Sequence, residues 1–364
     1  MKFVDLKKQY LKYKDEIDFA IKNVIENTAF INGPDVKAFE KELCEFSGSK
    51  NAIGCSSGTD ALVIPMMALN VKPGDEIIVP AFTFIATAET IAFLGAKPVF
   101  ADIDPITFNI DPKSIEEKIT AKTKGIISVS LYGQCADYDE INKIAKKHNL
   151  WVIEDGAQSF GAEYKNKKSG TLTDIGTTSF FPAKPLGCFG DGGAIFTNNF
   201  ETAEKMRIIL NHGQEKRYKH KYIGINGRLD TIQAAVLRVK LKYFKDEITL
   251  RNKAANIYTE NLKGIVETPE VLKDNLSTFA QYTIRVEKRN ELQEFLKSKD
   301  IPTVVHYPIP LYRQEAFEYL NENTKNFPVS EKLSREVMSL PMHPFLEEKD
   351  ILFVCSSIKD FYNG

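Results

Sequence analysis

Residues 51–62 read Asn-Ala-Ile-Gly-Cys-Ser-Ser-Gly-Thr-Asp-Ala-Leu. The apolar run at 51–55 predicts a short buried strand, the small residues at 56–60 predict a turn, and 61–69 is typical of a helix. Such a unit presents backbone N–H groups at a helix amino terminus, where an anion is favoured. Gly58, Thr59 and Asp60 are therefore candidates for a phosphate site, although the same residue types also cap helices that bind nothing.

The alternation of strand and helix continues along the chain. Strands are expected at 76–79, 98–103, 125–131 and 151–154, and helices at 86–94, 112–119 and 138–148. Several of these strands are near-continuous apolar runs, which indicates a sheet covered by helices on both faces. We therefore predict an α/β fold with a mainly parallel mixed sheet, in which ligands collect at the carboxyl ends of the strands.

The length of 364 residues favours a large domain plus a smaller one. We assign residues 1–245 to amino-terminal helices, expected at 6–27 and 35–46, and a large ligand-binding domain. Residues 246–364 form the predicted small α/β domain, with a strand near 281–286, a helix at 291–299 and a terminal helix beyond 347. A long helix or kinked pair at 229–262 would bridge the two.

Lys184 stands among aromatic, aliphatic and proline residues in the stretch 179–193. Burial disfavours an ammonium group and would lower the pKa of this lysine, leaving an amine able to attack a carbonyl and form a Schiff base. The alternative is a lysine whose stem lies along apolar surface while its head reaches water.

Asp155 directly follows the apolar run at 151–153, so its carboxylate should be buried and should need a positive partner or hydrogen-bond donors. A pyridinium nitrogen is one such partner; an aspartate that merely caps the loop is the alternative. Phe84 and Gln158 follow neighbouring strands. A phosphate site, an aromatic residue, a buried acid and an apolar lysine together are what pyridoxal phosphate requires.

Composition excludes several other classes. The formal net charge is −1, which argues against nucleic-acid binding. Neither a signal peptide nor a membrane span is present in the sequence, so a cytoplasmic, soluble protein is expected. The five cysteines and five histidines are not spaced as disulfide or metal motifs. A nicotinamide oxidoreductase would need a Gly-x-Gly-x-x-Gly turn, which this sequence lacks. A regulator that binds the cofactor without catalysis would bring a DNA-binding segment, which the sequence also lacks.

Six motifs then carry a resemblance to a known family. They are Ser-Gly-Thr-Asp-Ala-Leu (57–62), Phe-Thr-Phe-Ile-Ala-Thr-Ala-Glu (82–89), Val-Ile-Glu-Asp-Gly-Ala-Gln-Ser (152–159), Ser-Phe-Phe-Pro-Ala-Lys-Pro-Leu-Gly (179–187), Gly-Asp-Gly-Gly-Ala (190–194) and Asn-Gly-Arg-Leu-Asp (226–230). The chain resembles the DegT/DnrJ/StrS sugar-nucleotide aminotransferases over nearly its whole length. The resemblance implies a fold-type I pyridoxal-phosphate enzyme that works as a homodimer, with active sites at the subunit interface.

The resemblance also implies roles for single residues. Lys184 would form the imine with the cofactor aldehyde and move protons, Asp155 would pair with the ring nitrogen, Gln158 would lie near the ring and Phe84 would stack on it.

The phosphate would be held by the turn residues Gly58, Thr59 and Asp60, by Ser179, and by Asn226 of the other subunit.

Four further stretches, 129–137, 184–198, 305–311 and 338–344, resemble the branch that aminates C3 of 3-keto sugar nucleotides. The implied substrate is a UDP-linked 3-oxo-N-acetylglucosamine or its uronate, with L-glutamate as amino donor and a product used in surface polysaccharide or lipid A; a C3 or C4 aminotransferase for a dTDP-linked sugar is the alternative. Arg228, His306 and Tyr307 are the candidates for sugar contacts. Arg228 could instead pair with an acid such as Asp230, and His306 could be a core histidine.

Overall fold

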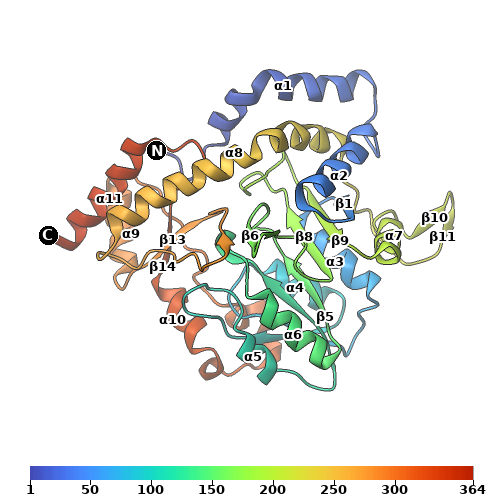
Figure 1. Cartoon of the computed structure of the whole chain (residues 1–364). Helices are drawn as coiled ribbons and strands as arrows, with labels where there is room; N and C mark the ends of the chain where they lie inside the picture. Colours follow the sequence, from blue (N-terminus) through green and yellow to red (C-terminus); the bar gives the residue numbers. More distant parts are fainter. Residues whose placement is uncertain (364) are drawn as a thin grey trace.

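A mixed sheet forms the centre of the molecule in the computed structural model, which describes residues 1–363 (Figure 1). Within that range its seven strands run in the order β1-β9-β8-β5-β4-β2-β3, and only β9 is antiparallel to its neighbours. The bounds are β1 Asn51–Cys55, β2 Glu76–Pro80, β3 Lys97–Ala101, β4 Thr123–Val129, β5 Trp151–Asp155, β8 Ile175–Ser179 and β9 Gly193–Thr197. The predicted α/β class and mainly parallel sheet are confirmed.

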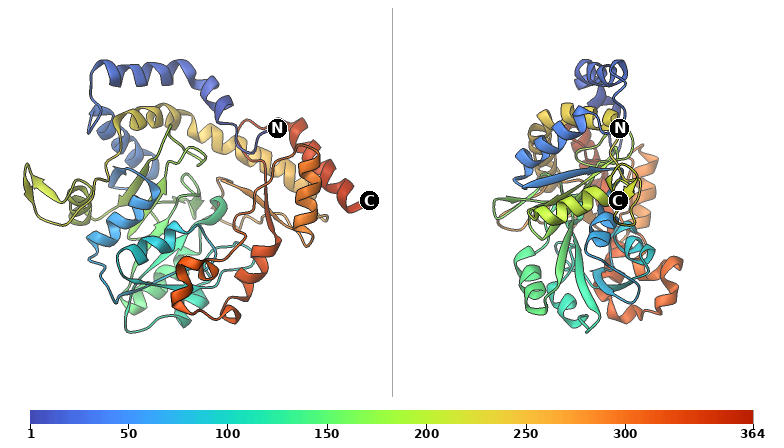
Figure 2. Two further views of the ribbon diagram at one scale, coloured as in Figure 1. Left: turned by 180° about the vertical axis from the view of Figure 1, so that it is seen from behind. Right: turned by 90° about the vertical axis from the view of Figure 1, so that its right-hand side faces the viewer.

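Helices cover both faces of this sheet, as the apolar strands predicted (Figure 2). Ile77 and Val79 point to the face that holds α3 (Gly58–Ala68), α4 (Ala86–Phe93) and α7 (Phe200–Ile209). Ile78, between them, points to the other face and packs against α5 (Pro112–Glu117) and α6 (Tyr138–His148). Successive residues of a strand thus serve different cores, because side chains alternate across a sheet.

The chain begins with two helices that pack on the outside of the large unit. α1 (Leu6–Glu26) lies along α8, and α2 (Pro34–Ser47) contacts both α8 and β1. Asp5 caps α1 through its carboxylate, which accepts from the Lys8 backbone N–H at 2.9 Å. Gly48 ends α2 with a φ of 82°, a conformation that suits glycine. Both helices lie where the sequence predicted them.

A single helix, α8 (Thr231–Leu262), joins the sheet region to a second hydrophobic core (Figure 1). Its first half packs with α2 and its second half with α11 (Glu348–Asn363). The other elements here are β13 (Tyr282–Arg285), β14 (Val337–Leu340), which pairs with it in antiparallel fashion, and α9 (Arg289–Ser298). The boundary between residues 245 and 246 falls inside this continuous helix and stays a prediction.

Short elements complete the chain. The pair β10 (Gln214–Lys216) and β11 (Lys219–His220) forms a hairpin that projects from the body of the molecule (Figures 1 and 2). The others are β6 (Glu163–Tyr164), β7 (Lys167–Lys168), β12 (Asn275–Leu276) and α10 (Pro328–Glu336). None of the described helices is long and apolar enough to cross a membrane.

Candidate active site

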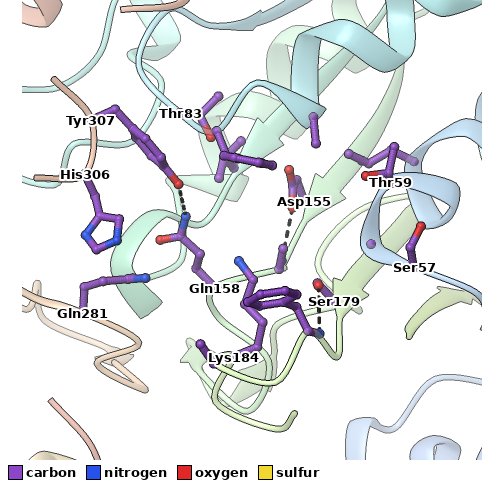
Figure 3. A pocket seen from close by; sticks show the side chains of 18 of the residues that line it. Ser57, Thr59, Thr83, Asp155, Gln158, Ser179, Lys184, Gln281, His306 and Tyr307 are labelled. Carbon is purple, nitrogen blue, oxygen red and sulfur yellow. Dashed lines mark hydrogen bonds between the residues drawn. The ribbon is translucent and has the colours of Figure 1, made fainter. Parts of the chain in front are cut away.

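A cavity of about 480 Å³ opens at the carboxyl ends of the sheet strands (Figure 3). One end is formed by the turn before α3 and the other by residues of the second core region. The sequence-predicted residues that line it are Gly58, Thr59, Phe84, Asp155, Gln158, Ser179, Lys184, His306 and Tyr307. The fold therefore gathers residues spread over 250 positions around one space.

The turn before α3 forms a compact cradle. Ser57 caps the helix, because its Oγ accepts from the Asp60 backbone N–H at 3.0 Å. Gly58 packs directly on Ser179, where a Cβ on the glycine would lie 2.6 Å from the serine Cβ. Thr59 is exposed to the cavity. Hydroxyls and a helix amino terminus thus face the same end of the space, which suits a phosphate.

Asp60, the other turn residue, does not line the cavity. Its carboxylate accepts from the Ser56 hydroxyl within the turn. A phosphate contact from Asp60 is therefore limited to its backbone N–H, which Ser57 already uses.

Asp155 ends β5 and is buried, with 6% of its surface exposed. Its two carboxylate oxygens accept from the Thr87 hydroxyl at 2.9 Å and from the Ala157 backbone N–H at 3.1 Å. Burial raises the pKa of this carboxyl, while the two hydrogen bonds and the charge of Lys184 oppose the rise. The carboxylate is therefore held in a fixed orientation, and a cationic group bound in the cavity would stabilise its charge.

Glu154, the residue before Asp155, points to the opposite face of the sheet. Its carboxylate accepts from the Ser169 hydroxyl at 2.6 Å and the Gly170 backbone N–H at 2.8 Å, and it is fully buried. Burial raises the pKa of Glu154 to about 7. Two consecutive acids thus face separate surroundings.

Lys184 projects into the cavity from a tight loop after β8 (Figure 3). Its backbone N–H donates to the Phe181 carbonyl at 2.8 Å, and Gly187 packs so closely that a Cβ there would lie 2.4 Å from the Pro182 carbonyl oxygen. Burial lowers the pKa of Lys184, and Asp155 acts in the opposite direction. The side chain is half-buried and lines the cavity, and its role stays a prediction.

Gln158 and Tyr307 form one side of the cavity (Figure 3). The Gln158 amide nitrogen donates to the Tyr307 phenol oxygen at 3.1 Å, and its oxygen accepts from the Tyr132 backbone N–H at 2.9 Å. The Phe84 ring lies 6.2 Å from the Tyr307 ring, centroid to centroid, and is 53% exposed. An aromatic face therefore remains open to a ligand.

His306 lies beside Tyr307, and its Nδ1 is 2.9 Å from the Ser339 hydroxyl. Burial, followed by the nearby charge of Lys184, lowers the pKa of His306 to about 4. This imidazole is therefore neutral at pH 7.

Asn226 and Arg228 lie outside this cavity. An isolated bridge pairs Asn226 with Asn211, and the Arg228 guanidinium donates to the Asn211 side-chain oxygen at 2.6 Å. The sequence alternative that paired Arg228 with Asp230 is wrong, since its partner is the amide of Asn211. In the described chain these two residues do not reach the space around Lys184.

Sequence reasoning missed several residues of the site. Thr87 orients Asp155, and Ser57, Asp191 and Gln281 line the cavity. Ser57 could have been found, because it occupies the cap position of the quoted turn. Thr87 and Asp191 could also have been found, because they lie in the quoted motifs 82–89 and 190–194, whereas Gln281 carried no local signal. In the described part of the chain, no group of three or more His, Cys, Asp or Glu side chains is placed to hold a metal ion.

The model of the DegT/DnrJ/EryC1/StrS aminotransferase family matches residues 12–359. The chain is 52% identical to a UDP-2-acetamido-2-deoxy-3-oxo-D-glucuronate aminotransferase of Pseudomonas aeruginosa, over 98% of this chain and 99% of that protein. It is 40% identical to a UDP-N-acetyl-3-dehydro-alpha-D-glucosamine 3-aminotransferase of Acidithiobacillus ferrooxidans, over 99% and 98% of the two chains.

Solved structures show the same relationship. A DegT DnrJ EryC1 StrS aminotransferase from Brucella abortus superposes with a TM-score of 0.96 at 42% identity and covers 100% of both chains. A Bacillus subtilis protein solved with bound cofactor PMP has a TM-score of 0.90 at 33% identity, covering 99% of this chain and 85% of that one.

Proposed function

Since the chain belongs to the DegT/DnrJ/EryC1/StrS aminotransferase family, we propose that it transfers an amino group to C3 of a UDP-linked 2-acetamido-3-oxo sugar, with L-glutamate as donor. The enzyme class is an aminotransferase, and its cofactor is pyridoxal phosphate. The observation that carries the proposal is the meeting of Lys184 and Asp155 in one cavity, at whose far end α3 begins with its Ser57 cap.

The residues present fit pyridoxal phosphate. Ser57, Thr59 and Ser179 offer hydroxyls and a helix amino terminus to a phosphate, and the space beside Gly58 would be filled by any Cβ. The exposed face of Phe84 matches a flat ring. Asp155, raised in pKa and short of positive charge, matches a protonated ring nitrogen.

Bound there, the cofactor would supply an aldehyde that accepts an amine and a ring that withdraws electrons from the carbon losing its proton. The chain's own contribution is positional and acid–base. Lys184, whose pKa is lowered by burial, loses its proton more readily than an exposed lysine, and its amine can take a proton from one carbon and return it to another. Asp155 keeps its carboxylate aimed by Thr87 and Ala157, so its charge is available without reorganisation.

Gln158 and Tyr307 act as a pair. Because the Gln158 amide donates to the Tyr307 oxygen, the phenol hydrogen remains free to donate into the cavity. Burial holds the pKa of Tyr307 well above its ordinary value, so this hydrogen stays in place. The pair is suited to an oxygen acceptor on the cofactor or the sugar.

The proposed substrate is the uronate named for the Pseudomonas relative. The neutral UDP-3-oxo-N-acetylglucosamine is the second candidate. The observation in its favour is that the side of the cavity formed by Gln158, His306 and Tyr307 carries no cation, since His306 is neutral. Arg228, the cation available for a uronate, could reach the site only from a second copy of the chain. We infer such a homodimer, with Asn226 and Arg228 contributed across the interface.

We infer further that the product serves surface polysaccharide or lipid A, and that the enzyme works in the cytoplasm. Cell fractionation tests the second inference.

The experiment that tests the function uses the purified, cofactor-loaded protein. Adding L-glutamate should abolish the visible absorbance of the bound cofactor, and adding the correct UDP-3-keto sugar should restore it. Both UDP sugars and a dTDP-linked 3-keto sugar are offered in parallel. Failure of glutamate to change the absorbance would refute the donor, and restoration by the dTDP sugar alone would refute the nucleotide.

A further inference from the structure

Gln281 lines the cavity, but no role described above accounts for it. It directly precedes β13 and reaches the space from the second core region. Its side-chain oxygen is buried and has no hydrogen-bond partner within residues 1–363. Figure 3 shows the amide nitrogen pointing into the cavity beside His306. A buried polar atom without a partner is costly, so such an amide calls for a ligand that can complete its hydrogen bonds.

The neighbours of Gln281 limit what that ligand can be. His306 is neutral at pH 7, because burial lowers its pKa to about 4, and its Nδ1 is engaged with Ser339. Tyr307 offers a phenol hydrogen. This part of the cavity therefore provides neutral donors, and the unmet acceptor of Gln281 would reach the cavity when the amide turns about its last torsion. A carboxylate only accepts hydrogen bonds, so it could not pair with the Gln281 oxygen, and no cation here would balance its charge. A neutral group that both donates and accepts hydrogen bonds fits better.

We propose that Gln281 is a specificity-determining residue that binds the 2-acetamido group of the sugar, an inference that rests on the proposed function. The group is attached to C2, next to the carbon that must lie at Lys184. It is a planar secondary amide whose N–H and carbonyl point to opposite edges, so the Gln281 amide can pair with it at either edge. The last torsion of a glutamine side chain is soft, so the amide can turn its oxygen or its nitrogen to the ligand. A 2-hydroxyl extends less far from the ring and offers no carbonyl to the Gln281 amide nitrogen.

The test compares two substrates. One is the UDP-linked 3-keto sugar with a 2-acetamido group, and the other is its counterpart with a 2-hydroxyl. Gln281→Met keeps the length of the side chain and removes its hydrogen bonds. Gln281→Asn keeps the amide on a side chain that is shorter by one methylene group. It replaces the methionine variant in the test if that variant folds poorly. Gln293→Met on α9, which does not line the cavity, is the matched control.

The methionine variant should lose about 10-fold to 100-fold in kcat/KM for the 2-acetamido sugar and about 3-fold or less for the 2-hydroxyl sugar. The Gln293→Met control should match the wild type on both sugars. Gln281→Asn should show a smaller loss with the same preference.

Equal losses on the two sugars, or no loss on the 2-acetamido sugar, would overturn the assignment of Gln281 while leaving the function intact. If the wild type aminates neither sugar, the proposed function fails and the assignment falls with it.

Discussion

Replacing Asp155 by asparagine should separate stability from catalysis. The carboxylate is buried and its pKa is raised, so the folded protein without cofactor gains little from its charge. Asparagine fills the same volume and retains an acceptor for Thr87 or Ala157, but not for both. The lost hydrogen bond costs about 1 kcal/mol, and the relief of charge burial offsets part of it. We expect the free energy of unfolding without cofactor to change by about 1 kcal/mol or less.

The catalytic effect should be far larger. Two opposite unit charges 4 Å apart attract by about 4 kcal/mol at an effective dielectric constant of 20. Asparagine removes this attraction for a protonated ring nitrogen. At about 1.4 kcal/mol for each factor of ten, the rate with glutamate should fall about 1000-fold.

The assay is rapid mixing of the cofactor-loaded variant with glutamate, followed by absorbance, beside chemical denaturation of the cofactor-free protein. Glu154→Gln is the matched control: it is the adjacent buried acid on the same strand, but it faces away from the cavity. Its rate should stay within about 3-fold of the wild type. A loaded Asp155→Asn protein that retains its rate within about 10-fold would refute the role of Asp155.

Three further predictions follow from the site and its surroundings. Lys184→Ala should still bind cofactor but lose transamination by at least about 1000-fold, measured by amine formation on the keto sugar; near-normal turnover would mean another base does the work. Gly58→Ala places a Cβ 2.6 Å from the Ser179 Cβ, so cofactor affinity should fall about 10-fold or more in a titration of the cofactor-free protein, and an unchanged affinity would contradict the phosphate cradle. The pKa of Glu154 is raised from 4.5 to about 7, so between these pH values the folded state binds its proton more tightly than the unfolded state does. The free energy of unfolding should therefore drop by up to about 3 kcal/mol as pH rises from 4.5 to 7. Glu154→Gln should flatten this pH profile. A variant with the same slope as the wild type would assign the drop to other groups.

Much of the fold and of the site was predictable, because parallel strands deliver their following residues to one edge. Asp155, Gln158 and Lys184 could be expected to lie near one another from the alternation of strands and helices along the chain, because each follows a strand of the sheet.

What could not be predicted depends on contacts between distant segments. Gln281 enters the cavity only through the packing of the second core region against the sheet, and Thr87 reaches Asp155 only because of the order of strands in the sheet. Asp60 has the residue type of a phosphate ligand, yet its carboxylate is turned back to Ser56 by the geometry of the helix start. Residue type and local pattern do not specify these orientations.

Because Glu154 and Asp155 are adjacent, the register in which β5 pairs with its neighbours determines which of the two acids faces the cavity. Asp155 stands opposite Val129 of β4 and Thr177 of β8, and Glu154 stands one step earlier on both sides. A slip of one residue would exchange the faces of the two acids. Glu154 would then meet the ligand, and Asp155 would lie among the groups around Ser169. The alignment of a single strand therefore decides which of two neighbouring acids lines the cavity and which one is buried on the opposite face of the sheet.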